Sequence, residues 1–232
     1  MLELVCECRD FLSDFCFPYA ICGGYAIEMF LGKETRPHGD LDITIFNEDR
    51  KHIVDFLLSK EWDAFTPPNE ANYIERIASP EDSRAINPKG LFAIKPGCSL
   101  FKLEQVPGDR TKHKFIDTNN QQTDFDFIDI IFNQRYGNEF VFWSFTDRGK
   151  NITRELDKAI LFYEDIPYLS PEVILFINAP PEYFDSGYHR EKNRIDFEST
   201  IPCLPSESKR WLVNALETTY PDGHRWFEQL RK

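Results

Sequence analysis

The feature that most constrains this chain is a pair of aspartates inside a strongly alternating segment. Residues 40–46 read DLDITIF, which places Asp40 and Asp42 on one face of a predicted strand and the aliphatic residues between and after them on the other. Two carboxylates on one face of a strand repel each other unless a cation lies between them. Oxygen ligands of this kind suit Mg²⁺. The segment therefore predicts a strand that carries a metal site.

A glycine pair precedes this strand. Gly23 and Gly24 follow an apolar run that ends at Cys22, and they begin a helical segment that we expect from about Gly24 to Leu31. Glycine lets the backbone approach a ligand closely, and the N–H groups at a helix start attract phosphate. Each feature alone is weak, because most Gly-Gly pairs are plain turns and most Asp-x-Asp segments are exposed edges. Their order and spacing together predict a site for a metal-chelated nucleoside triphosphate.

Three short motifs lie close together in this part of the chain: GGYA at residues 23–26, the segment from Gly32 to Arg36, and HGDLD at residues 38–42. Together they resemble the nucleotidyltransferase superfamily, and within it the aminoglycoside and lincosamide adenylyltransferase-like branch. The resemblance implies an α+β fold, with a mixed β-sheet flanked by helices. It also implies a catalytic core over residues 1–150 and a C-terminal helical region over residues 151–232 that completes the cleft. A fainter similarity extends into the C-terminal third, while the middle of the chain matches poorly.

A nucleotidyltransferase needs a third carboxylate on a strand beside the first pair, and residues 124–132 (DFDFIDIIF) offer one. Alternation puts Asp124 and Asp126 on one face of the expected strand and Asp129 on the other. Asp129 lies in the most apolar part, where a charge without a purpose would be costly. The family pattern, an aspartate ahead of an apolar run that ends in Asn, also falls on it. We select Asp129 as metal ligand or base and hold Asp126 in reserve; the alternative is that all three aspartates face water or cap a turn.

The resemblance also implies contacts to the nucleotide beyond the glycine pair, and it assigns them to Arg36, His38 and Lys192. Lys192 lies on a helix expected over residues 189–199, where its charge can neutralise the β- and γ-phosphates, although a surface lysine would show the same pattern. His38 would orient the first aspartate or line the nucleotide site, and a structural hydrogen bond is an equally ordinary use of a turn histidine. The family usually has Asp after the lysine, whereas this chain has Asn193, which leaves the role of this helix open.

The charge of the chain narrows the class of acceptor. The net charge is −12, from 39 acidic and 27 basic residues. An acidic surface argues against a protein that grips a nucleic acid backbone over a long track. It is compatible with cationic small molecules, which it would attract, and it is also the ordinary composition of a well-dissolved protein.

Two further classes of protein are disfavoured by the sequence. The six cysteines show no zinc-site spacing, because Cys6 and Cys8 are too close for a Cys-x-x-Cys pair and no second pair matches them. No apolar run approaches the ~20 residues of a membrane span, and the N-terminus lacks a basic start followed by an apolar block. We therefore expect a cytoplasmic protein with reduced thiols and no membrane partner.

The remaining elements follow from periodicity and from helix-boundary residues. The helix with the best-defined start opens with Ser170 as N-cap and Pro171 at its first position. The basic run at residues 110–114 is expected to be a solvated loop and residues 151–169 an extended connector. Further helices are expected at residues 2–16, 48–59, 206–219 and 223–230, and strands at residues 17–22, 62–65, 90–94, 101–103 and 137–145.

These observations lead to one functional hypothesis. Asp40, Asp42 and Asp129 hold Mg²⁺, the glycine pair seats the triphosphate, and a nucleoside monophosphate, AMP from ATP, moves to a hydroxyl of a small molecule of aminoglycoside type. The acceptor would lie near residues 61–120 and 190–200. Two alternatives stay open, namely modification of a tRNA end or a protein by the same core, and a non-catalytic nucleotide-binding relative. The oligomeric state is not indicated by the sequence.

Overall fold

The structure is a computed structural model that describes residues 2–86, 90–118, 120–142, 152–179 and 187–231. These residues form two compact units, each of which is described by itself. The first, called the sheet unit, consists of Leu2–Ile21 and Pro37–Gln134, and the second, called the helical unit, consists of Cys22–Arg36 and Arg135–Lys232. Within the described ranges, no helix combines the length and the apolar character needed to cross a membrane.

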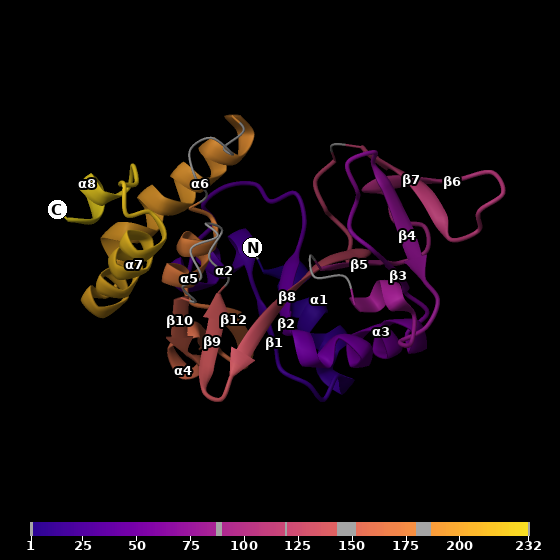
Figure 1. The fold of residues 1–232 in the computed structure, drawn as a ribbon, viewed down its shortest axis with the longest axis horizontal. Coiled ribbons are helices and arrows are strands. Elements are labelled where there is room, and N and C mark those ends of the chain that lie inside the picture. Colours follow the sequence, from indigo (N-terminus) through magenta and orange to yellow (C-terminus); the bar gives the residue numbers. More distant parts are fainter. Residues whose placement is uncertain (1, 87–89, 119, 143–151, 180–186, 232) are drawn as a thin grey trace. The chain divides into compact units, whose positions relative to one another are not determined.

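The sheet unit is built on a mixed β-sheet whose strands lie in the order β1-β2-β8-β5-β3-β4-β7-β6 (Figure 1). The central strands β2 and β8 run parallel, and the other neighbouring strands of this series pair antiparallel. The bounds are β1 Tyr19–Ile21, β2 Asp42–Phe46, β3 Asp63–Phe65, β4 Tyr73–Ile77, β5 Leu91–Ile94, β6 Phe101–Gln105, β7 Lys112–Asp117 and β8 Phe127–Tyr136.

Two helices of the sheet unit carry apolar faces with helical spacing. Helix α1 (Glu3–Phe11) continues into a short 3-10 turn, and helix α3 (Arg50–Ser59) follows a 3-10 turn after β2. The ring of Phe11 lies 5.3 Å from that of Phe56 on α3 and 4.8 Å from that of Trp62, measured between ring centroids. Such aromatic contacts add about 0.5–1.5 kcal/mol each to the burial of apolar area, so they hold the two helices together.

Aromatic side chains also fill the far part of the sheet. Phe101 on β6 lies 4.4 Å from Phe115 on β7 and 4.8 Å from Phe127 at the start of β8, between ring centroids. The buried members of this cluster are Phe65, Ile74, Ile94, Leu100 and Phe127. The core therefore reaches from the strands beside the aspartates to the outer hairpin.

The helical unit combines two strand pairs with a set of packed helices. Strands β9 and β10 pair antiparallel, as do β11 and β12, and helix α5 contacts α2, α6 and α7. Its bounds are α2 Gly23–Leu31, β9 Glu139–Phe142, β10 Ile152–Glu155, α4 Leu156–Ala159, β11 Ile160–Tyr163, β12 Ile166–Leu169, α5 Pro171–Ile177, α6 Gly187–Thr200, α7 Ser206–Thr219 and α8 Phe227–Leu230.

Most predicted elements are present with small shifts of their ends, and the predicted α+β class with a mixed sheet is confirmed. Helix α5 begins at Pro171 directly after Ser170, as predicted, although the Ser170 side chain makes no capping hydrogen bond. The strand expected at residues 137–145 is found as β9, and its last three residues lie outside the described ranges. The division at residue 150 stays a prediction about functional regions; the compact units differ from it because α2 groups with the C-terminal helices.

Two predictions from local pattern were wrong. The basic run at residues 110–114 is not a loop throughout, because Lys112–Asp117 form β7 between β4 and β6. Tertiary pairing outweighs the charged composition here, since Phe115 on the same strand packs into the aromatic cluster. Within the described part of residues 151–169, two strands of a hairpin, a further strand and a short helix replace the expected extended connector.

Candidate metal and nucleotide site

The glycine pair begins helix α2 as predicted. Gly23, the first residue of the helix, has a φ of 64°, a left-handed conformation that favours glycine because a Cβ would be strained there. Gly24 is buried, and the side chain of Cys22, the residue before the helix, makes no capping hydrogen bond. The other end closes on Gly32, whose φ is also 64° and whose N–H donates to the carbonyl of Glu28. The sequence thus dictates both ends of this helix.

The three aspartates selected from the sequence come together in the sheet unit. Strands β2 and β8 pair in parallel with Asp42 directly opposite Asp129, so both side chains stand on the same face of the sheet. Asp40 precedes β2 and joins them. One carboxylate oxygen from each of the three residues lies within 4.8 Å of the others. We call these residues the acidic cluster.

The acidic cluster has the donor set of a hard cation. Mg²⁺ binds oxygen ligands at about 2.1 Å, so oxygens that share one ion are separated by up to about 4.2 Å. The spacing in the cluster is close to that range. Three carboxylate ligands without sulfur or nitrogen favour Mg²⁺ or Mn²⁺ over softer metals. The residues therefore fit the metal that the resemblance implies.

The electrostatics of Asp129 agree with a cation site. Burial, and next the charge of the neighbouring Asp40, raise the pKa of Asp129 to about 7. Without a cation the ionised form is thus disfavoured by both a partly desolvated site and a like charge. A divalent ion would reverse this balance, because it neutralises the charges that oppose ionisation.

Asp126, the reserve candidate, has a different place. Its side chain is 9% exposed, and its Oδ2 accepts a hydrogen bond from the backbone N–H of Ser99 at 3.1 Å. It precedes β8 and is not a member of the acidic cluster. The strand begins at Phe127, so the alternation assumed for residues 124–132 does not extend back to Asp126. Its contacts are those of a residue that stabilises the turn before the strand.

Two residues that form hydrogen bonds beside the acidic cluster were not identified from the sequence. Asn133 on β8 donates from Nδ2 to Oγ1 of Thr44 on β2 at 2.6 Å. Thr44 and Asn133 lie on the same face as Asp42 and Asp129, two and four residues further along their strands. The bond ties the two strands together and supports the register that places the aspartates opposite each other. The second such residue is Gln122, whose Oε1 accepts a hydrogen bond from the backbone N–H of Leu41.

Arg36 forms a bidentate ion pair within the helical unit. Its Nε and Nη2 each donate to Asp196 on α6 at 2.8 Å, and the carboxylate is fully buried. This geometry ties the segment after α2 to α6. Asn193, which replaces the family's Asp, donates from Nδ2 to the carbonyl of Asn178 at 2.8 Å, so it anchors α6 to the end of α5. A nucleotide contact by Arg36 stays a prediction.

The remaining predicted nucleotide contacts are Lys192 and His38, both half-buried. Lys192 lies on α6 in the helical unit, where Gly23 and Gly24 also lie, whereas His38 belongs to the sheet unit with the acidic cluster. The assignment of these residues to a triphosphate stays a prediction.

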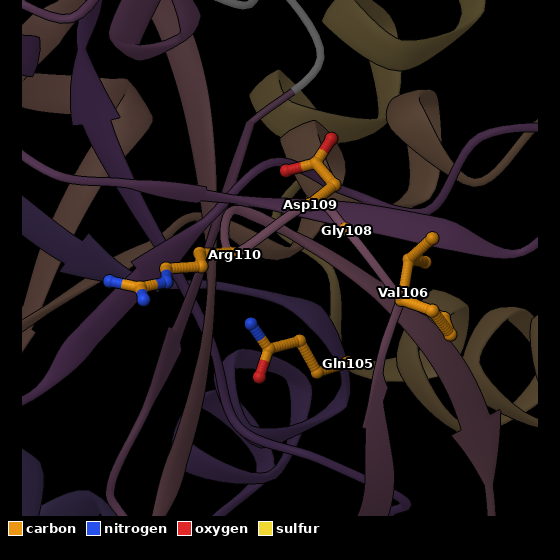
Figure 2. Close-up of a pocket in the computed structure, with 6 residues that line it drawn as sticks. Gln105, Val106, Gly108, Asp109 and Arg110 are labelled. Carbon is orange, nitrogen blue, oxygen red and sulfur yellow. The ribbon is translucent and has the colours of Figure 1, made fainter.

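A hollow of about 300 Å³ lies away from the acidic cluster, at the turn between β6 and β7 (Figure 2). It is lined by six consecutive residues, Gln105 to Arg110. None of the aspartates or glycines discussed above borders it. We assign it no role in the site.

Comparison with known proteins supports the reading of the N-terminal motifs. A family model described as aminoglycoside-2''-adenylyltransferase matches residues 4–67, which include the glycine pair, Asp40 and Asp42. A search of curated proteins finds no match. The match therefore covers the part of the chain in which the resemblance was seen, but not the strand that carries Asp129.

One solved structure of similar fold extends the comparison to nearly the whole chain. The solution structure of the antibiotic-resistance factor ANT(2'')-Ia has a TM-score of 0.51 and 14% identity, over 95% of this chain and 93% of that one. The lincosamide antibiotic adenylyltransferase LnuA, solved with lincomycin bound, has a TM-score of 0.47 and 13% identity, over 86% of this chain and 98% of that one. An antigenic nucleotidyltransferase-like protein from Paracoccidioides brasiliensis has a TM-score of 0.45 and 14% identity, over 98% and 90%.

The family match covers the N-terminal motifs, and the first of these structures has a fold similar to that of this chain. The family whose model matches residues 4–67 is one of nucleotidyltransferase enzymes. The resemblance of this chain to the aminoglycoside and lincosamide adenylyltransferase-like branch of the nucleotidyltransferases is therefore confirmed.

Proposed function

We propose that the protein is a Mg²⁺-dependent adenylyltransferase that moves AMP from ATP to a hydroxyl of a small cationic molecule of aminoglycoside type. The observation that carries the proposal is the meeting of Asp40, Asp42 and Asp129 within 4.8 Å, on the strands next to the family signature. The same meeting speaks against the non-catalytic alternative, which required Asp129 to point away from the pair.

Each residue of the site has a distinct task in the proposed reaction. Asp40 and Asp42 would hold Mg²⁺, which when bound supplies charge neutralisation for the triphosphate. The N–H groups at the start of α2, after Gly23, would receive phosphate oxygens. Asp129 would complete the metal site or accept the proton of the acceptor hydroxyl. The hydroxyl oxygen bonds to the α-phosphorus, the bond to pyrophosphate breaks, and the proton leaves to the base.

The choice of acceptor rests on the family and on charge. The family model that matches residues 4–67 is that of an aminoglycoside-modifying enzyme. The net charge of −12 favours the approach of a polycation such as an aminoglycoside and opposes the approach of RNA. The two observations are independent, and both are compatible with the same acceptor class.

The test is a transfer assay with α-³²P-labelled ATP and Mg²⁺. The acceptors are an aminoglycoside panel, lincomycin and bulk tRNA, each in its own reaction. We expect label on an aminoglycoside with release of pyrophosphate, no transfer in EDTA, and loss of transfer in Asp42→Asn. Asp124→Asn changes an exposed aspartate shortly before β8; it is the control and should keep its activity. Label on tRNA or on a protein, and not on the antibiotics, would contradict the proposed acceptor and support modification of a tRNA end or a protein. Normal ATP binding without transfer to any acceptor would contradict the proposed function.

A further inference from the structure

Gln122 is a buried polar residue in the loop that leads to β8, with 7% of its surface exposed. Its Oε1 accepts a hydrogen bond from the backbone N–H of Leu41 at 2.9 Å. Its Nε2 donates to the carbonyl oxygens of Phe127 at 2.8 Å and Asp124 at 3.1 Å. Its own backbone N–H donates to the carbonyl of Gly39 at 3.0 Å. Both N–H donors and the oxygen of the side-chain amide are therefore in use.

These hydrogen bonds enclose Asp40. Gly39 and Leu41 are its two neighbours in the chain, and Gln122 binds both of them. The carbonyl of Leu41 in turn accepts a hydrogen bond from the backbone N–H of Asp129 at 3.0 Å. The backbone on both sides of Asp40 is thus fixed to the segment that carries the third carboxylate.

Asp40 requires this support more than the other two members of the acidic cluster. Asp42 and Asp129 are paired in the sheet, whereas the ladder begins at Asp42 and does not include Asp40. Repulsion among three carboxylates pushes a loop residue outward unless its backbone is held. A metal ligand functions only when it is held to within about 0.5 Å of its place. The amide of Gln122 is positioned to supply that restraint.

We propose that Gln122 is a positioning residue that holds Asp40 in the acidic cluster and thereby sets the affinity of the site for a divalent cation. The proposal rests on the proposed function only in that the bound cation is the one used in nucleotidyl transfer. Groups that orient metal ligands typically change metal affinity by 10- to 100-fold when they are removed. No motif in the sequence marks this glutamine.

The first test compares Gln122→Met with Gln121→Met. Methionine matches glutamine in length but cannot make these hydrogen bonds, and Gln121 is the exposed neighbour of the same residue type. Mn²⁺ binding to each folded protein is measured by electron paramagnetic resonance, well below its melting temperature. We expect Gln121→Met to bind like the wild type and Gln122→Met to bind about tenfold more weakly.

Activity supplies a second readout. The Mg²⁺ concentration that gives half-maximal transfer should rise by the same factor in Gln122→Met, while kcat at saturating Mg²⁺ stays within about twofold of the wild type. A merely structural role would lower the melting temperature and leave both cation measurements unchanged, which would overturn the proposal. If Gln122→Met does not fold, Gln122→Asn replaces it, since its amide is one methylene too short to bridge both segments.

A double-mutant cycle tests whether Gln122 acts through Asp40. Asp40→Asn by itself should weaken Mn²⁺ binding. In that variant the position of residue 40 matters less for Mn²⁺ binding, because its carboxylate is gone. Adding Gln122→Met should therefore weaken Mn²⁺ binding by less than about threefold further. A full tenfold further loss would overturn the proposed route through Asp40.

The outcomes separate this proposal from the proposed function. A wild-type protein that binds no Mn²⁺ would overturn both. A wild type that binds Mn²⁺ and transfers AMP, with Gln122→Met equal to it in Mn²⁺ affinity, would overturn the positioning role alone. If the wild type binds Mn²⁺ and transfers nothing, the proposed function fails, and the Mn²⁺ affinities of the variants still decide the role of Gln122.

Discussion

Replacing Asp129 by asparagine removes a charge from the acidic cluster and keeps the shape of the side chain. Burial and the neighbouring Asp40 raise the pKa of Asp129 to about 7 in the folded protein, against about 4 in an unfolded chain. Between these values the folded state binds more protons than the unfolded state. The contribution of Asp129 to stability is therefore fully present below about pH 4 and is lost as the pH rises through 7. In EDTA at mildly alkaline pH, Asp129→Asn should be the more stable protein.

The size of this effect follows from the pKa shift and the exposure of the side chain. A shift of about 3 corresponds to an upper limit of about 4 kcal/mol in the free energy of unfolding. Asp129 is only half-buried, so water reduces the unfavourable interactions, and we expect a gain of about 1–3 kcal/mol. Mg²⁺ should diminish or reverse the difference, because binding stabilises the folded wild type by mass action and the variant lacks one ligand.

Urea denaturation, monitored by tryptophan fluorescence, measures the free energy of unfolding. The titrations are made at several pH values between about 5 and 8, once in EDTA and once in Mg²⁺. Asp124→Asn is the matched control. Its carboxylate is exposed near the start of the same strand, so we expect a change of less than about 0.5 kcal/mol at every pH.

Two results would refute this reasoning. One is a variant that is less stable than the wild type in EDTA at about pH 8, since removal of a disfavoured charge cannot destabilise the fold in this way. The other is a difference between variant and wild type that does not change with pH, since the gain must grow as Asp129 ionises.

Three further predictions concern the scaffold. Asp196→Asn removes the buried charge that pairs with the guanidinium of Arg36 and should lower the unfolding free energy by about 2–4 kcal/mol; an equally stable variant in a urea titration would contradict the ion pair. Burial, and next the charge of Arg225, lower the pKa of His224 to about 4, so stability should fall as the pH drops from about 6.5 to 4, and His224→Gln should flatten that part of the curve. A Cβ at residue 90 would lie 2.6 Å from the carbonyl oxygen of Ile130 on β8, so Gly90→Ala should cost about 2 kcal/mol or more in thermal unfolding, while unchanged stability would show that this contact relaxes.

The sequence was sufficient where a signal is local. Alternation at residues 40–46 predicts strand β2, because side chains in a strand alternate with period two, but the strand begins at Asp42 and Asp40 lies just before it. Gly24, Gly32 and Pro171 predict the ends of helices through their backbone preferences, which need no partner. The order of the glycine pair and the two aspartates was enough to indicate the family.

The tertiary structure decided which distant residues meet. The sequence favoured Asp129 over Asp126, but only the parallel register of β2 with β8 places Asp129 opposite Asp42. Gln122 acts through backbone groups of residues far along the chain, and a backbone hydrogen bond leaves no pattern in the sequence. Strand β7 was not predicted because its charged residues are typical of a loop. The segment is a strand because it pairs with β4 and β6. Local preferences are fixed by the residue and its neighbours, whereas strand register is fixed by the packing of the whole core, which no short segment contains.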